Sequence, residues 1–92
     1  MNRKELVETV AREAGLTAAQ ATAAVAAVLD GVVTSVARGE KVNLPGFGTF
    51  ELRHRAARSG RNPQTGEAME IAASDAPAFK PAAAFKQAVA DR

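Results

Sequence analysis

Four arginines and no acidic residue lie within residues 52–63, at positions Arg53, Arg55, Arg58 and Arg61. Guanidinium groups suit phosphates and also donate to the O2 and N3 acceptors on the floor of a DNA minor groove. Side chains alternate along a strand, so Arg53 and Arg55 would point to the same side. For any single arginine, a solvated edge strand is the simpler interpretation. Four together, with no acid among them, favour contact with a polyanion.

Arg58 and Arg61 belong to the stretch RSGRNPQTGE, residues 58–67, which has no side chain able to anchor a core. Asn62-Pro63 and Thr65-Gly66 are typical of a turn, and a turn residue is the simpler interpretation of Pro63. A rigid apolar ring without an N–H could also act as a wedge between base pairs. The arginine-rich setting favours the wedge.

The net charge of +2 is unevenly distributed. Residues 1–40 carry four basic and five acidic groups, a balance of −1, whereas residues 41–92 carry eight and five, a balance of +3. A gathered positive charge is the pattern expected of a protein that binds nucleic acid.

A chain of 92 residues forms one domain at most, and its core is small. Alanine accounts for 22 residues, and the four aromatic residues are all Phe. Without cysteine there is no disulfide or thiolate metal site to stabilise the fold. Association with a second copy is the remaining way to bury enough apolar surface.

Two helices are predicted at the N-terminus. Asn2 and Glu5 have the spacing of a capping box, and Gly15 ends the first helix. Thr17 and Gln20 repeat the box for a second helix over 18–38, about 30 Å long. Its apolar positions repeat with helical spacing: Ala21, Ala24, Val25, Val28, Leu29, Val32, Val33 and Val36. This stripe needs more cover than the first helix provides, which indicates a partner subunit.

Strand alternation follows from residue 40 onward. Segments 42–44 and 50–52 predict a hairpin around Pro45-Gly46-Phe47-Gly48, where the glycines serve the turn rather than a phosphate loop. Residues 53–75 predict a second, longer hairpin without a core of its own, here called the arm; disorder is the alternative. Pro81 would open a short final helix over 82–90, in which Phe85 and Val89 share a face.

Other classes of function find little support. His54 is the one histidine and is expected on the strand face opposite Arg53 and Arg55, while Ser59 and Thr65 have no base nearby. We therefore expect no enzyme, no metal, no cofactor and no small-molecule substrate. No apolar run approaches the roughly 20 residues of a membrane span, and MNRKELVETV lacks a signal-peptide pattern. The expected location is the cytoplasm, without membrane contact.

The stretch GFGTFELRHRAARSGRNPQTGE, with the following IAASDAPAFKP, resembles the HU family of bacterial histone-like DNA-binding proteins, within the superfamily that includes integration host factor. The similarity begins at MNRKELV and covers essentially all 92 residues as a single HU-like domain. It implies an α+β fold: an intertwined homodimer with an N-terminal helical hairpin (1–39), then a three-stranded antiparallel sheet, a protruding β-ribbon arm and a short C-terminal helix (40–92).

The resemblance also implies roles for single residues. Pro63 would intercalate with Arg61 and Asn62 beside it, and Arg53, Arg55 and Arg58 would line the inner side of the arm. Arg3 and Lys80 would touch phosphates on the body. The dimer core would contain Phe47, Phe50 and Phe79.

The function implied is largely sequence-independent binding and bending of double-stranded DNA in the minor groove, with compaction of the nucleoid. A sequence-selective bender of the integration-host-factor type is the alternative, and phosphate attraction also allows RNA. Two departures from the family pattern weaken phosphate contacts on the body. Ala82-Ala83 replaces a usual Gly-Lys, and Ala18-Ala19 stands where a lysine is common.

Overall fold

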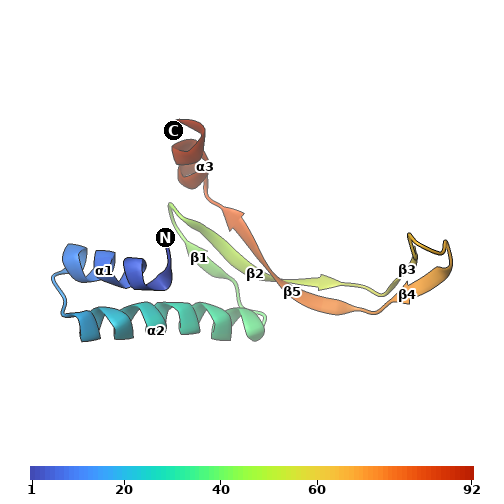
Figure 1. Ribbon diagram of the computed structural model, residues 1–92, viewed down its shortest axis with the longest axis horizontal. Coiled ribbons are helices and arrows are strands. Elements are labelled where there is room, and N and C mark those ends of the chain that lie inside the picture. Colours follow the sequence, from blue (N-terminus) through green and yellow to red (C-terminus); the bar gives the residue numbers. More distant parts are fainter. The chain divides into compact units, whose positions relative to one another are not determined.

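The computed structural model describes residues 1–92 and has an α+β architecture (Figure 1). Its elements are α1 (Arg3–Ala14), α2 (Ala18–Ala37), β1 (Val42–Leu44), β2 (Gly48–Arg55), β3 (Arg58–Arg61), β4 (Ala68–Ile71), β5 (Ser74–Pro81) and α3 (Ala83–Ala90). The predicted α+β class, with two N-terminal helices, a three-stranded antiparallel sheet, a β-ribbon arm and a short C-terminal helix, is confirmed. The chain divides into two compact units, Met1–Ser35 and Val36–Arg92. The prediction of a single domain, with a helical part over residues 1–39 and a sheet-and-arm part over residues 40–92, stays a prediction.

Both N-terminal helices begin at the caps predicted from the sequence. Asn2 Oδ1 accepts a hydrogen bond from the Glu5 N–H at 2.9 Å. Thr17 and Gln20 form a reciprocal box, with the Gln20 N–H donating to Thr17 Oγ1 at 3.1 Å and the Thr17 N–H donating to Gln20 Oε1 at 3.0 Å. Gly15 ends α1 at a φ of 67°, a left-handed conformation that favours glycine.

An apolar cavity of about 250 Å³ lies between α1 and α2 within the N-terminal unit. Its lining residues are Leu6, Val10, Ala24, Val25, Val28 and Leu29. Val28 remains 62% exposed in the single chain and Val33 67%. One copy of the chain therefore leaves much of the α2 stripe uncovered.

By length and composition alone, α2 could also cross a membrane. The expectation that no segment approaches a membrane span is therefore wrong for α2. Its 20 residues consist mostly of alanine and valine, and Asp30 is the one charged residue among them. The core helix of a soluble protein meets the same two criteria. Ala21, Val25 and Val36, the three buried hydrophobic residues of the chain, all lie on this helix.

The C-terminal unit contains a three-stranded antiparallel sheet in the order β1-β2-β5. Val42 pairs with Phe50 across the first hairpin, and the turn closes with the Phe47 N–H donating to the Leu44 carbonyl at 2.9 Å. Gly46 adopts a φ of 80°, so its role is turn geometry, as predicted. The sheet provides the base from which the arm extends along β2 and β5.

The arm contains a second antiparallel ladder, β3–β4, which confirms the predicted hairpin. The β2–β5 ladder ends at the pair Arg55–Ser74, and the β3–β4 ladder begins at Arg58–Ile71. Two residues on each leg separate the ladders, so the register continues without a bulge. The unpaired residues are four alanines: Ala56, Ala57, Ala72 and Ala73. We call β3, β4 and their connecting turn the distal hairpin.

The final helix begins one position later than predicted. Pro81 is the last residue of β5, where it pairs with Gly48, and Ala82 is the N-cap of α3. The prediction that Pro81 opens the helix is therefore wrong. Its missing N–H costs little at a strand end, where the ladder stops.

Four phenylalanines form an aromatic cluster in the C-terminal unit. The ring centroids of Phe50 and Phe79 lie 4.7 Å apart, those of Phe47 and Phe85 5.4 Å, and those of Phe47 and Phe79 5.5 Å. Such separations are typical of packed aromatic pairs. Even so, Phe47 is 47% exposed and Phe79 38% exposed in the single chain.

Candidate nucleic-acid interface

The distal hairpin ends in a turn that is held together by Asn62. The Asn62 N–H donates to the Glu67 carbonyl at 2.9 Å, and the Gly66 N–H donates to the Asn62 carbonyl at 2.7 Å. Asn62 Oδ1 also accepts from the Gln64 N–H at 2.9 Å. These bonds leave the exposed Pro63 ring at the first position of the loop, where its fixed φ suits a turn and its missing N–H leaves no donor unpaired.

The arginines of the distal hairpin lie on opposite faces of the ribbon. Partners across an antiparallel ladder share a face, and successive residues alternate. Arg58 therefore shares its face with Ile71, whereas Arg61 lies on the other face with Ala68. The two arginines cannot both line one inner surface of this hairpin. The sequence-based assignment of Arg58 to the inner side stays a prediction.

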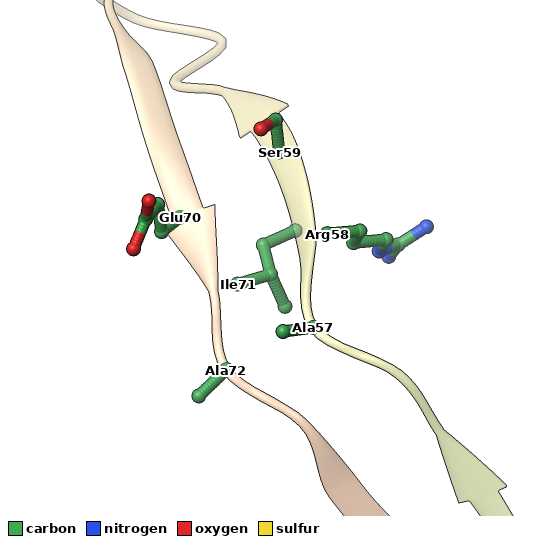
Figure 2. Close-up of a pocket in the computed structure, with 6 residues that line it drawn as sticks. All are labelled: Ala57, Arg58, Ser59, Glu70, Ile71 and Ala72. Atoms are coloured by element: carbon green, nitrogen blue, oxygen red, sulfur yellow. The ribbon is translucent and has the colours of Figure 1, made fainter.

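The four unpaired alanines leave a gap where the two ladders meet. A cavity of about 380 Å³ opens there, lined by Ala57, Arg58, Ser59, Glu70, Ile71 and Ala72. Figure 2 shows the Ile71 side chain between the two legs and the Arg58 guanidinium directed away from them. A Cβ on Gly60 would lie 2.9 Å from Ile71 Cδ1, so the isoleucine occupies the space that the glycine leaves. The cavity is a shallow gap between strands with no converging polar groups.

Arg53 and Arg55 lie on β2, on the same face as Glu51. All four arginines of the arm are exposed, and none forms an ion pair within the chain. Their positive charge is therefore free for an external anion.

Lys80 has a different environment. Its ammonium group lies 2.9 Å from Glu51 Oε1, and the Lys41 ammonium lies 3.7 Å from Glu51 Oε2. The hydrogen bond and charge of Lys80, with the more distant charges of Lys41 and Arg53, hold the pKa of Glu51 below its usual value, against a smaller opposing effect of burial. Lys80, predicted as a phosphate contact, is thus already paired in the free chain.

His54 lies on the β2 face opposite the arginines, as expected from alternation. Its Nδ1 lies 2.6 Å from Asp75 Oδ1 on the paired strand. This pair holds the two legs of the arm together next to the alanine gap. Sequence reasoning did not find Asp75, because that required the strand register.

Arg3, the other predicted phosphate contact, is the first residue of α1 and is exposed. It belongs to the N-terminal unit, whereas the arm and Lys80 belong to the C-terminal unit. Ala18 and Ala19, at the start of α2, carry no charge.

Comparison with known proteins identifies the family. The family model described as bacterial DNA-binding protein matches residues 1–90. The DNA-binding protein HU of Geobacillus stearothermophilus is 57% identical over 89 residues, which cover 97% of this chain and 99% of that protein. HU of Staphylococcus aureus (strain COL) is 54% identical over the same length. The chain belongs to the HU family of bacterial DNA-binding proteins.

Solved HU structures share the fold. The Anabaena HU–DNA cocrystal structure superposes with a TM-score of 0.88 at 48% identity and covers both chains completely. A V42I mutant of HU from Thermotoga maritima gives a TM-score of 0.71 at 30% identity, covering 97% of this chain and 99% of that one. The resemblance inferred from the GFGTFELRHR and RSGRNPQTGE stretches is thereby confirmed.

Within the HU family fold, two residues that carry negative charge were missed as candidates: Glu51 and Asp75. Each contacts a basic partner across the β2–β5 pair of strands. Glu51 has a further contact with Lys41 on the other side of β2, and this one had a signal in the sequence: a first hairpin turn at residues 45–47 places Lys41 opposite Glu51.

Proposed function

We propose that this protein is an architectural DNA-binding protein whose arginine-bearing arms bind double-stranded DNA in the minor groove and bend it. The observation that carries the proposal is the arm itself, with four exposed arginines that lack partners within the chain. The related Anabaena HU was crystallised with DNA. Phosphate contacts of this kind supply most of the sequence-independent affinity for DNA.

Pro63 is proposed as the wedge that enters the base stack. Its ring is exposed at the turn of the distal hairpin, and the turn is closed by backbone bonds on both sides of it. Architectural minor-groove proteins, HU itself among them, insert apolar wedges that kink DNA by roughly 20–90°. Arg61 and Asn62 lie beside Pro63, and Arg53, Arg55 and Arg58 would follow the groove toward the body.

The binding unit is proposed to be a homodimer. A single chain buries no aromatic side chain and leaves Phe47, Phe79, Val28 and Val33 between 38% and 67% exposed. Obligate dimer interfaces resemble a protein core divided between two chains. A second copy would cover the Phe cluster and the α2 stripe, and would give the assembly two arms.

Binding is proposed to depend little on sequence, so the protein would compact the nucleoid in the cytoplasm. The contacts come almost entirely from arginines, and minor-groove acceptors distinguish little beyond A·T from G·C. A selective bender of the integration-host-factor type would instead depend on the deformability of its site. Competition against mixed genomic DNA separates the two, since specific binders prefer their site by about a thousandfold or more.

Phosphate attraction extends the proposal to RNA as a secondary partner. Single-stranded RNA has no minor groove, and the minor groove of A-form RNA is wide and shallow, so neither offers a comparable site for the arm and its proline wedge. Duplex DNA should therefore compete efficiently against RNA of equal length. No catalytic role is proposed for His54 and Asp75, whose side chains are 67% and 59% exposed and are not enclosed in a pocket.

A salt series tests the proposal. Affinity for linear, nicked and pre-bent duplexes is measured by fluorescence anisotropy at increasing salt. Log affinity should fall linearly with log salt, by about 0.9 per phosphate contacted. Nicked and pre-bent duplexes should bind more tightly than linear ones, because less bending energy is required. Affinity indifferent to salt would contradict the electrostatic basis of the proposal.

A further inference from the structure

The polar face of the three-stranded sheet contains one carboxylate among several cations. We define this polar face by six residues: Lys41, Asn43, Thr49, Glu51, Arg53 and Lys80. Glu51 lies between the ammonium groups of Lys80 at 2.9 Å and Lys41 at 3.7 Å. Lys80 reaches it from β5, and Lys41 reaches it from the position just before β1; these two strands flank β2, the central strand of the sheet.

The exposure of the three side chains is unequal. The Glu51 side chain is 13% exposed, whereas those of Lys41 and Lys80 are 73% and 65% exposed. The carboxylate thus lies low on the sheet, and the two flexible lysines extend over it with most of their surface in solvent. Both ammonium groups remain accessible to an anion arriving from outside.

We propose that the Glu51 carboxylate competes with DNA phosphate for Lys41 and Lys80, and so restrains DNA contact on the polar face. This inference rests on the proposed DNA-binding function and adds a residue that limits it. A phosphate that binds either lysine must weaken the lysine's pairing with Glu51 or approach a fixed negative charge. In both cases the contact between phosphate and lysine contributes less favourable free energy to DNA binding.

The remaining contacts of the polar face support this interpretation. The Thr49 hydroxyl donates a hydrogen bond to Asn43 Oδ1 at 3.1 Å. These two residues provide no further charge. Arg53 follows on the same face of β2 and has no ion pair. A DNA backbone that left the arm along this face would meet a free guanidinium first, then two lysines restrained by one carboxylate.

Glu51→Gln tests the proposal, because glutamine keeps the size and polarity of the side chain and removes its charge. Glu8→Gln is the matched control, with the same change in net charge at an α1 residue that has no ion pair. Affinity for a mixed-sequence linear duplex is measured over a salt series. Glu51→Gln should bind about two- to fivefold more tightly at low salt, the range expected of an exposed ion pair. Glu8→Gln should bind nearly as the natural protein does.

A double-mutant cycle with Lys80→Met distinguishes competition from a purely structural role. Lys80→Met should cost less affinity in the natural protein, where Glu51 already engages the lysine, than in the Glu51→Gln background. Equal costs in the two backgrounds, or no gain of Glu51→Gln over Glu8→Gln, would overturn the inference. If the natural protein itself bound without salt dependence, the proposed function would fail instead.

Folding of each variant is checked by its circular dichroism melting curve. Glu51 is in the middle of β2, so Glu51→Thr, which places a β-branched residue in the strand, is the second variant. The same gain in affinity is expected from both uncharged variants. A gain from neither, with both folded, would count against the proposal.

Discussion

Arg58 and Arg61 lie three residues apart on β3, and strand alternation places them on opposite faces of the distal hairpin. Arg58 shares its face with Ile71, and Arg61 shares the other with Ala68. A ribbon lying in a minor groove has a wall of sugar and phosphate on either side. Arginines on both faces therefore allow the hairpin to contact both strands of a duplex.

If both faces contact DNA, Arg58→Ala and Arg61→Ala should each weaken binding and each reduce the salt slope by about 0.9, the value for one phosphate. The double variant should lose both contributions. Arg12→Ala, the same charge change on the exposed surface of α1, is the control and should leave the slope nearly unchanged. A slope altered by only one arm variant would show that one face alone meets the backbone.

Dimer formation predicts that stability depends on protein concentration. Anything that binds the folded chain, including a second copy, raises its apparent stability by mass action. The thermal midpoint measured by circular dichroism should therefore rise as the protein is concentrated. Sedimentation equilibrium should find no well-folded monomer on dilution, and a stable folded monomer would contradict the dimer.

Phe79→Ala tests the same interface by its energetic cost. Removing a fully buried phenylalanine costs about 3–5 kcal/mol, whereas Phe79 is 38% exposed in the single chain. A free energy of unfolding lowered by the full amount would indicate that a second copy covers this side chain. A much smaller loss in chemical denaturation would mean that Phe79 stays at the surface.

Gly48 allows β2 and β5 to approach each other. A Cβ at this position would lie 2.5 Å from Phe79 Cε1 and 2.6 Å from the Lys80 carbonyl oxygen, and the backbone atom cannot move aside cheaply. Gly48→Ala should lower the free energy of unfolding by about 1–3 kcal/mol. Gly31→Ala, at a helical position with nothing within 4 Å, should not lower it. Equal stability of the two variants would contradict the close approach.

Ion pairing of Glu51 predicts a pH dependence of stability. The pKa of Glu51 is lowered in the folded chain from its ordinary value of 4.5, chiefly by the hydrogen bond from Lys80. Its contribution to stability is therefore present above pH 4.5 and is lost as the pH falls through the lowered pKa. Urea unfolding should show Glu51→Gln less stable than the natural protein at neutral pH, with the difference vanishing in acid. A difference independent of pH would contradict the ion pair.

The helices and turns could be predicted because their signals are local. The Thr17–Gln20 box and the turn at Gly46 act within a few residues, and both are present as expected. The aromatic cluster was predicted in part: Phe47, Phe50 and Phe79 were named, but Phe85 was placed only on a helix face. Its contact with Phe47 depends on where α3 lies relative to the sheet.

The charge contacts of the sheet could not be predicted in the same way. Glu51 and Lys80 are diagonal neighbours on adjacent strands, and their approach depends on the β2–β5 register. The register of that pair is determined by the length of the whole arm, not by a local motif. The alanine gap has no clear signal either, because alanine is compatible with a strand and with an unpaired segment. The location of Pro81 in β5 was missed because proline suits a helix start and a strand end equally.

Bending by Pro63 is the most direct test of the central claim that the arm binds and kinks DNA. Energy transfer between dyes at the two ends of a linear duplex reports the end-to-end distance as protein is added. The natural protein should shorten that distance, and Pro63→Ala should keep the dimer and most of the affinity while shortening it clearly less. An end-to-end distance that does not change when the natural protein binds, or that shortens equally with Pro63→Ala, would contradict the account.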